Sequence, residues 1–248
     1  MPPVIILKFD DVAPRAGDIP QNWRSLAAYL ESNGIAAGFG VVSEGFRHAS
    51  LPSAVAQWFA DRQASGLIEF WCHGWDHDAH QENGEWHCEF HSRPEELVRR
   101  RLARCNEVAR AVFGRAYRTF GPTGHARAHD SGFDAASLAA VAADPDLQIV
   151  LYNRPMDEDA RAVSGRLAIL DRVWEVNTES HVGYPDFARF EEGYAKHAAA
   201  REYFVLQGHP GVWDERGFAD FERIVDFLRA RDAKFMTPSD YVDFRSPS

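Results

Sequence analysis

The sequence predicts an α/β fold in which parallel strands form a (β/α)-type barrel, and two observations support this prediction. Short apolar runs alternate with longer amphipathic stretches along the whole chain, which is the pattern of repeated β-α-β units. The length of 248 residues is normal for an α/β barrel that folds as one unit. No linker-like or low-complexity segment divides the chain, so we expect one domain over residues 1–248. The alternative is an open doubly wound sheet, but no glycine-rich phosphate loop follows any predicted strand.

Each strand is predicted from a short apolar run, and each helix from an apolar stripe with helical spacing. The first helix, for example, places Trp23, Leu26 and Leu30 on one face. Glycines at positions 34, 66 and 114 end the first three helices. The predicted strands cover residues 4–9, 36–42, 67–72, 118–120, 148–152, 167–171 with a continuation over 174–176, 203–207 and 234–236. The predicted helices cover residues 22–32, 53–64, 94–113, 133–143, 187–200 and 218–230.

The charge balance and the cysteines restrict the partner and the compartment. The chain has 27 basic and 37 acidic side chains and a formal net charge of −10, which weighs against nucleic-acid or anionic-membrane partners because phosphates need a basic surface. Its three cysteines are an odd, sparse set and a poor disulfide framework. No apolar run approaches the ~18 residues of a membrane span, and none resembles a signal peptide. We therefore expect a soluble, cytoplasmic protein with no membrane span; no feature of the sequence indicates its oligomeric state.

Polar residues collect where the predicted strands end, which is where parallel barrels carry their chemistry. The first strand ends in Asp10 and Asp11, the third runs into His73 and His77, and the penultimate one is followed by His209. The two histidines are four residues apart, so on one helical turn both rings could ligate one ion. Two imidazoles and one carboxylate leave open positions on a zinc-like ion, which is the catalytic pattern. One aspartate would then be a ligand and the other a general base, whereas the alternative is a solvated acidic turn.

Four segments, KFDDV, HGWDH, FGPTG and LQGHP, occur in the order and rough spacing of the polysaccharide deacetylase (NodB-homology, carbohydrate esterase family 4) superfamily. The chain resembles an outlying branch of this superfamily from about residue 4 to about residue 238. The resemblance implies an irregular (β/α)7-type barrel that holds one divalent metal ion, most often zinc. It implies Asp10 as the general base and His209 as the general acid that protonates the leaving amine. Asp11, His73 and His77 would be the metal ligands.

The function that this resemblance implies is metal-dependent hydrolysis of a non-peptide C–N amide bond. We expect removal of an N-acyl group, N-acetyl first of all, from a small-molecule or oligosaccharide amino sugar or a sugar precursor, with a role in surface polysaccharide biosynthesis. Two alternatives stay open. One is a deformylase or another non-sugar amide hydrolase on the same metal site. The other is a carbohydrate-binding pseudoenzyme without catalysis.

Two departures from the family pattern concern the partners of the catalytic residues. The family commonly has an arginine before the proline of its third motif, where it pairs with the base aspartate, but here Gly121 precedes Pro122. Arg118 and Arg127 are candidate replacements, unless Asp10 lacks such a partner. The carboxylate that orients the acid histidine usually adjoins a tryptophan, and here either Asp171 or Glu175 could take that role.

The remaining candidates concern substrate contacts. Trp75 and Trp213, which we expect to be exposed, are candidates for stacking on a sugar ring, although a tryptophan next to a buried histidine more often packs in the core. Thr123 or His125 could contact the substrate, or belong to a surface loop. The segment 80–91 contains three histidines and a cysteine. We expect it to form a lid over the barrel mouth, and a second metal site is the alternative. Strand alternation turns Cys72 toward the core. The arginines of residues 99–104 suggest a solvated helix face.

Overall fold

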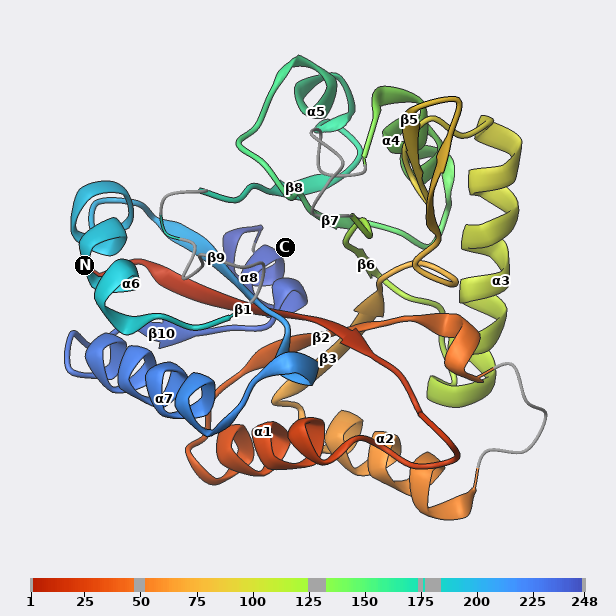
Figure 1. Cartoon of the computed structure of the whole chain (residues 1–248). Helices are drawn as coiled ribbons and strands as arrows, with labels where there is room; N and C mark the ends of the chain where they lie inside the picture. Colours follow the sequence, from red (N-terminus) through yellow and green to blue (C-terminus); the bar gives the residue numbers. More distant parts are fainter. Residues whose placement is uncertain (1, 47–51, 125–132, 174–175, 177–183, 247–248) are drawn as a thin grey trace.

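The computed structural model describes residues 2–46, 52–124, 133–173, 176 and 184–246. Its main sheet has eight parallel strands (Figure 1): β1 (Val4–Val12), β2 (Ala37–Val41), β3 (Ile68–Cys72), β6 (Thr119–Phe120), β7 (Ile149–Leu151), β8 (Ala168–Leu170), β9 (Tyr203–Gly208) and β10 (Lys234–Phe235). A separate antiparallel hairpin consists of β4 (Ala79–Glu82) and β5 (Glu85–Cys88). The α-helices are α1 (Gln21–Ser32), α2 (Ser53–Ser65), α3 (Glu95–Phe113), α4 (Ala135–Ala143), α5 (Glu158–Val163), α6 (Phe187–Gly193), α7 (Glu215–Arg229) and α8 (Pro238–Arg245).

The sheet curls into a nearly closed barrel around β1. Residues 4–9 of β1 pair with residues 203–208 of β9 on one side, and on the other side β1 pairs first with β10 and then with β2. The order continues through β3, β6 and β7 to β8. No ladder joins β8 to β9 in the described part of the chain, but the Tyr203 hydroxyl donates to Asp171 Oδ1 at 2.7 Å across this gap. The predicted (β/α)7-type barrel is therefore confirmed.

Side chains along the strands alternate between the barrel interior and the surrounding helices. On β1, Ile5 and Leu7 belong to the large core under the helices, whereas Ile6 packs in a smaller cluster inside the barrel. Because the side-chain period of a strand is two, Lys8 and Asp10 follow Ile6 into the interior. The same alternation places Trp71 inside and Cys72 outside, so the prediction that Cys72 belongs to the core is confirmed.

Trp71 fills the centre of the barrel. A Cβ atom added to Gly40 would lie 2.4 Å from this indole, and one added to Gly121 would lie 2.6 Å from it. Real Cβ atoms do not approach a ring so closely, so any side chain at these positions would push the ring away. The two glycines on the wall of the barrel are therefore matched to the one large aromatic residue at its centre.

The helix boundaries follow from local capping. Gly66 and Gly114 adopt left-handed conformations after α2 and α3, as predicted for helix ends. Helix α7 begins three residues earlier than predicted because the Asp214 side chain accepts the N–H of Gly217 and caps it. The helix predicted over residues 187–200 is α6 followed by the π-helical turn η3 (Tyr194–Ala198). The hairpin, α5 and α8 were not predicted, since each is short and lacks a strong apolar period.

Two further expectations concern the whole chain. None of the described helices is long and apolar enough to cross a membrane. Cys72, Cys88 and Cys105 are buried and are not joined by disulfides.

Residues 174 and 175 of the predicted continuation of the sixth strand lie outside the described part of the chain.

Candidate metal centre and active site

The ends of β1 and β3 bring three potential metal ligands together. Among the described residues, Asp11, His73 and His77 form the single group of acidic, histidine or cysteine side chains whose ligand atoms lie close enough for one ion, within 4.8 Å of one another. Asp11 Oδ1 lies 3.3 Å from His73 Nε2 and 3.4 Å from His77 Nε2. His73 is buried, whereas a third of the Asp11 and His77 side chains is exposed. The group therefore opens to solvent on the Asp11 and His77 side.

A β-bulge explains how two consecutive aspartates reach the same site. In a regular strand, neighbouring side chains point to opposite faces, so Asp10 and Asp11 would diverge. Here Phe9 pairs with Phe39 but Val12 pairs with Val41, so β1 carries one extra residue against β2. Asp11 adopts a positive φ of 76° within this bulge. Such a conformation is costly outside glycine and is typical of functional sites.

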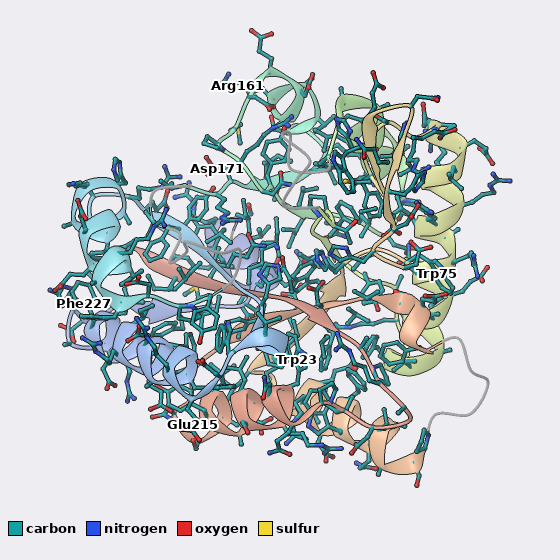
Figure 2. All side chains as sticks on the ribbon, in the orientation of Figure 1. Trp23, Trp75, Arg161, Asp171, Glu215 and Phe227 are labelled. Carbon is teal, nitrogen blue, oxygen red and sulfur yellow. The ribbon has the colours of Figure 1, made fainter. Side chains whose placement is uncertain are left out.

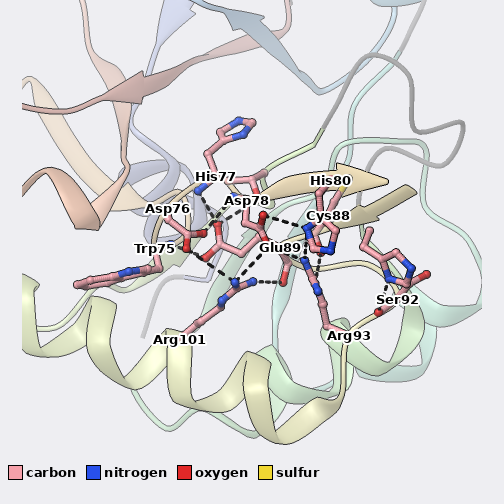
Figure 3. A network of polar contacts seen from close by, with 12 residues as sticks. Trp75, Asp76, His77, Asp78, His80, Cys88, Glu89, Ser92, Arg93 and Arg101 are labelled. Atoms are coloured by element: carbon pink, nitrogen blue, oxygen red, sulfur yellow. Dashed lines mark hydrogen bonds and ion pairs between the residues drawn. The ribbon is translucent and has the colours of Figure 1, made fainter. Parts of the chain in front are cut away.

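His73 and His77 are not on a helical turn, so that part of the prediction is wrong. Residues 73–78 form a loop in which Gly74 has a φ of 83° and His77 a φ of 56°. The loop is held from behind by the buried carboxylate of Glu89, which accepts the backbone N–H of Trp75 at 2.5 Å and of His77 at 3.0 Å. The His77 imidazole points away from this network (Figure 3). Glu89 thus ties the backbone of one ligand, and the sequence carried no signal for it.

The three ligand atoms fit a divalent ion. His73 Nδ1 lies 2.8 Å from the Gly121 carbonyl oxygen, so it carries the proton and leaves the Nε2 lone pair facing Asp11. Asp11 Oδ1 is buried and makes no hydrogen bond within the described residues. Ligands about 2.0–2.1 Å from a tetrahedral ion are separated by roughly 3.3 Å, close to the observed N···O distances. Three ligands of this kind leave a position open for water or substrate.

Asp10 lies beside this group and is paired with a cation that sequence reasoning missed. The Lys8 ammonium lies 2.5 Å and 2.6 Å from the two Asp10 oxygens, and both side chains are buried. The Gln207 amide donates to Asp10 Oδ2 at 2.6 Å. Arg118 is not the partner, because it pairs with Asp243. Arg127 lies outside the described residues. Strand alternation was the signal for Lys8, since residue 8 shares a face with residue 10.

The carboxylates of the site are held ionised although they are buried. Burial by itself raises the pKa of Asp10, but Lys8, His73 and His209 together hold it below its ordinary value. The pKa of Asp11 is also lowered, because the neighbouring His73 outweighs its burial. Both aspartates are therefore charged at neutral pH, as a ligand and a base must be.

His209 follows β9 and closes the other side of Asp10. Its Nε2 lies 3.7 Å from Asp10 Oδ2, while His73 Nε2 lies 3.8 Å from the same oxygen. Burial lowers the pKa of His209 against the opposing effect of Asp10. Its Nδ1 is buried and has no hydrogen-bond partner within the described residues. The imidazole is thus placed within reach of the same space as the base.

Asp171 does not orient His209. Its carboxylate accepts the Tyr203 hydroxyl at 2.7 Å and lies 3.0 Å from the Arg201 guanidinium. Tyr203 begins β9 whereas His209 follows its end, so about 20 Å of extended strand separates their backbones. Figure 2 shows Asp171 beside β8. The prediction for Asp171 is therefore wrong, and Glu175, the other candidate, lies outside the described residues.

The expected substrate contacts are mostly buried. Trp75 is 7 % exposed and Trp213 4 %, so the expectation that both are exposed is wrong. Trp75 lies beside α3 (Figure 2), where the Arg104 guanidinium covers its ring at 3.8 Å, and Trp213 packs edge-on against Phe9. Thr123 is buried, and its hydroxyl lies 3.4 Å from Glu89. These three residues pack behind the site. His125 lies outside the described residues.

The histidine-rich segment 80–91 forms the β4–β5 hairpin. His80 and His87 are cross-strand partners whose rings stack at 5.7 Å, and they do not join any metal-binding group of the described chain. Arg93 and Arg101 anchor the base of the hairpin through Asp78 (Figure 3). Arg101 is largely buried, so the expectation of a wholly solvated arginine face on α3 is wrong.

Comparison with known proteins decides the family. The family model described as polysaccharide deacetylase matches residues 1–142, which is more than half of the chain. The chain belongs to the polysaccharide deacetylase family. The predicted family is thus confirmed, and with it the enzyme class, a hydrolase of C–N amide bonds. Enzymes of this family typically use a divalent metal. No curated protein sequence matches the chain.

Solved structures of the same fold are distant in sequence. A family 4 acetyl xylan esterase from Clostridium thermocellum, in complex with a cobalt ion, is 14 % identical with a TM-score of 0.59, over 96 % of this chain and 89 % of that one. A Xyl-CE4 domain of a xylanase from the hindgut metagenome of Trinervitermes trinervoides is 12 % identical, with a TM-score of 0.60, over 99 % and 92 %. A CE4 family pseudoenzyme from Bacillus anthracis is 11 % identical, with a TM-score of 0.57, over 96 % and 64 %. These likenesses concern the fold.

Proposed function

We propose that this member of the polysaccharide deacetylase family is a metal-dependent amidohydrolase that removes an N-acetyl group from an amino sugar. The observation that carries this proposal is the juxtaposition of a three-ligand group, Asp11, His73 and His77, with Asp10, a buried carboxylate that pairs with Lys8. One side of the group is open to solvent, where a substrate can enter. Such a combination is what hydrolysis of an unactivated amide requires.

The residues divide the proton transfers between them. Asp10 takes a proton from the attacking water, whose oxygen bonds to the acyl carbon. His209 then donates a proton to the nitrogen as the C–N bond breaks, because an amine cannot leave as an anion. Acetate and the free amine are the products. A divalent ion held by Asp11, His73 and His77 would supply a Lewis acid for the acyl carbonyl and for the water.

Zinc, the acetyl group and the sugar are the finer parts of the proposal. Two imidazoles and one carboxylate are a donor set that suits zinc. Two of the structural neighbours, an acetyl xylan esterase and a T48 deacetylase, support an acetyl group. A sugar precursor as substrate, a cytoplasmic location and a role in surface polysaccharide biosynthesis stay predictions.

The competing function is a carbohydrate-binding pseudoenzyme. A pseudoenzyme of the same fold exists in Bacillus anthracis, and Gly121 stands where the family commonly has the arginine that pairs with the base. Against this hypothesis, the structure pairs Asp10 with Lys8 instead. Asp10 therefore keeps a cationic partner of the kind that a general base requires.

The first experiment measures metal content and acetate release together. Purified protein is analysed for zinc and assayed for acetate released from N-acetylchitopentaose, beside the His73→Ala/His77→Ala variant. About one zinc ion per chain and measurable acetate, both lost in the variant, would support the proposal. Zinc binding without release of acetate from any N-acetylated sugar or amide would favour the pseudoenzyme. Absence of zinc binding in the wild type would overturn both metal-dependent functions.

A further inference from the structure

We propose that Lys8 is the positioning residue that orients the Asp10 carboxylate as a base, in the role left vacant by the glycine before Pro122. The inference rests on the proposed function, since it concerns how the base of that reaction is held. It adds a residue that neither the spacing of the motifs nor the comparisons assign. Three independent features of the barrel interior support it.

The first feature is the geometry of the pair. Lys8 and Asp10 are two residues apart on β1, so their side chains share the interior face. The ammonium spans both carboxylate oxygens, at 2.5 Å and 2.6 Å, and the pair is only 2 % exposed. Gln207, which faces Lys8 across the β1–β9 ladder, adds a third hydrogen bond at 2.6 Å. The Asp10 side chain is thus held by hydrogen bonds from two neighbouring strands.

The second feature is the space that Lys8 occupies. Its ammonium lies over the Trp71 ring, 4.9 Å from the centroid, and this ring also meets the His73 imidazole edge-on at 5.0 Å. A Cβ atom at Gly121 would lie 3.3 Å from Lys8 Cε and 2.6 Å from Trp71. A side chain at position 121 and the present packing of Lys8 over Trp71 therefore exclude each other. Gly121 is the residue that makes room for the lysine.

The third feature is the cost of such a pair if it served stability alone. Removing two charges from water is expensive, and replacing a buried ion pair by apolar residues is often neutral or stabilising. The barrel interior near Lys8 contains the apolar cluster of Ile6, Val205 and Trp71, and it also holds Gln207 and the buried Arg172, whose charge acts against that of Lys8. Lys8 instead has a specific partner, because its ammonium contacts both Asp10 oxygens and so fixes the direction in which that carboxylate points.

A double-mutant cycle tests whether Lys8 acts through Asp10. The four proteins are the wild type, Lys8→Met, Asp10→Asn and the double variant, each loaded with zinc and checked for metal content. The exposed Lys234→Met is the control for loss of a lysine charge. The probes are N-acetylchitopentaose and 4-nitrophenyl acetate, whose phenolate leaves without an acid, so that the second probe reports the base step alone. In parallel, urea unfolding of the metal-free proteins measures the pair without any turnover.

The positioning role makes three expectations. Lys8→Met lowers kcat about 100-fold on both probes, within the 10²–10⁴-fold that a general base supplies, while KM and zinc content stay unchanged. In the Asp10→Asn background the same substitution changes kcat by less than about twofold, because the residue it acts through is already neutral. In urea, Lys8→Met has a lower midpoint than the double variant, since it leaves a buried carboxylate unpaired.

Other results would overturn the inference. An equal loss of kcat in both backgrounds would show a merely structural role for Lys8. Full activity of zinc-loaded Lys8→Met would remove any role, while leaving the proposed function intact. Failure of the wild type to turn over either probe with zinc bound would remove the proposed function and this inference with it. Should Lys8→Met not fold, Lys8→Gln takes its place, because the amide can still bond to Asp10 but carries no charge.

Discussion

Each end of the barrel interior holds a buried carboxylate, and the pKa values of the two are shifted in opposite directions. At the carboxyl end of the strands, Asp10 is paired with Lys8 and its pKa lies below the ordinary value. At the amino end, Glu69 accepts hydrogen bonds from the Thr119 hydroxyl at 2.5 Å and from the Ser239 N–H at 2.8 Å. It forms no ion pair among the described residues; the Arg118 guanidinium acts on it electrostatically from beyond ion-pair distance, and burial raises its pKa.

The difference shows what burial does by itself. Taking a carboxylate out of water favours its protonated form, and hydrogen bonds from hydroxyl and amide groups only partly oppose this. Glu69 therefore has a structural role: its hydrogen bonds with Ser239 connect β3 to the start of α8. The difference between the reactive carboxylate and the structural one is an ammonium group in direct contact with both oxygens, which Asp10 has and Glu69 lacks.

The largest effect is expected when each of the two carboxylates is neutralised in turn. Asp10→Asn is expected to lower kcat by about 10²–10⁴-fold with zinc still bound, because the base is lost. Glu69→Gln is expected to leave kcat within about twofold, since the residue lies at the far end of the barrel. Acetate release from N-acetylchitopentaose and zinc content measure both. A comparable loss in the two variants would contradict the division of roles.

A third buried carboxylate, Glu89, extends the comparison outside the barrel. Its pKa is raised to about 7, chiefly by burial, and it binds the backbone of the ligand loop. Glu89→Gln can accept only one of the two N–H groups of Trp75 and His77, so the loop loosens. We expect zinc affinity to fall about 10–100-fold, as for other residues that orient metal ligands. Competition with a chelator measures this, and the exposed Glu82→Gln on the same hairpin should leave the affinity unchanged.

The packing that sustains the catalytic end can be tested at Gly121. Gly121→Ala inserts a methyl group 2.6 Å from Trp71, which should lower the free energy of unfolding by about 1–3 kcal/mol. Gly165→Ala is the control, because nothing lies within 4 Å of its added Cβ. Urea unfolding of the metal-free proteins compares them. Equal stability of the two variants would mean that the interior accommodates the methyl group without displacing Trp71.

The smallest expected effect is the pH dependence that Glu69 confers. Its folded-state pKa is raised above the ordinary 4.5, so its contribution to stability is fully present below pH 4.5 and is lost as the pH rises through the raised value. In Glu69→Gln this dependence is absent. The variant should therefore gain stability relative to the wild type as the pH increases from 5 to 8. Urea midpoints of both metal-free proteins at each pH measure the difference, and a constant difference would contradict the raised pKa.

Most of the candidate site could be predicted because parallel strands deliver their carboxyl ends to one place. Asp10, His73 and His209 each follow an apolar run, and that position alone drew attention to them. Lys8 could also have been found, since residues two apart on a strand share a face. Glu89 could not have been predicted. It follows β5 and binds the backbone of Trp75 on the ligand loop, a contact that depends on the tertiary structure and not on any local sequence pattern. The error over Asp171 has the same origin, since Tyr203, its partner, lies across the barrel gap.

The amino-acid sequence alone was enough to predict the order of the main-sheet strands and the longer helices, the faces of the regular strands, and the residues at the strand ends. These features depend on near neighbours in the chain, which set periodicity and capping. Three features could be seen only in the tertiary structure. Lys8 pairs with Asp10, and a bulge turns Asp11 to the same side as Asp10. The absence of a side chain at Gly121 leaves room for the Trp71 ring. Those outcomes depend on the register between strands far apart in sequence, and a difference of one residue in that register would turn every side chain to the opposite face.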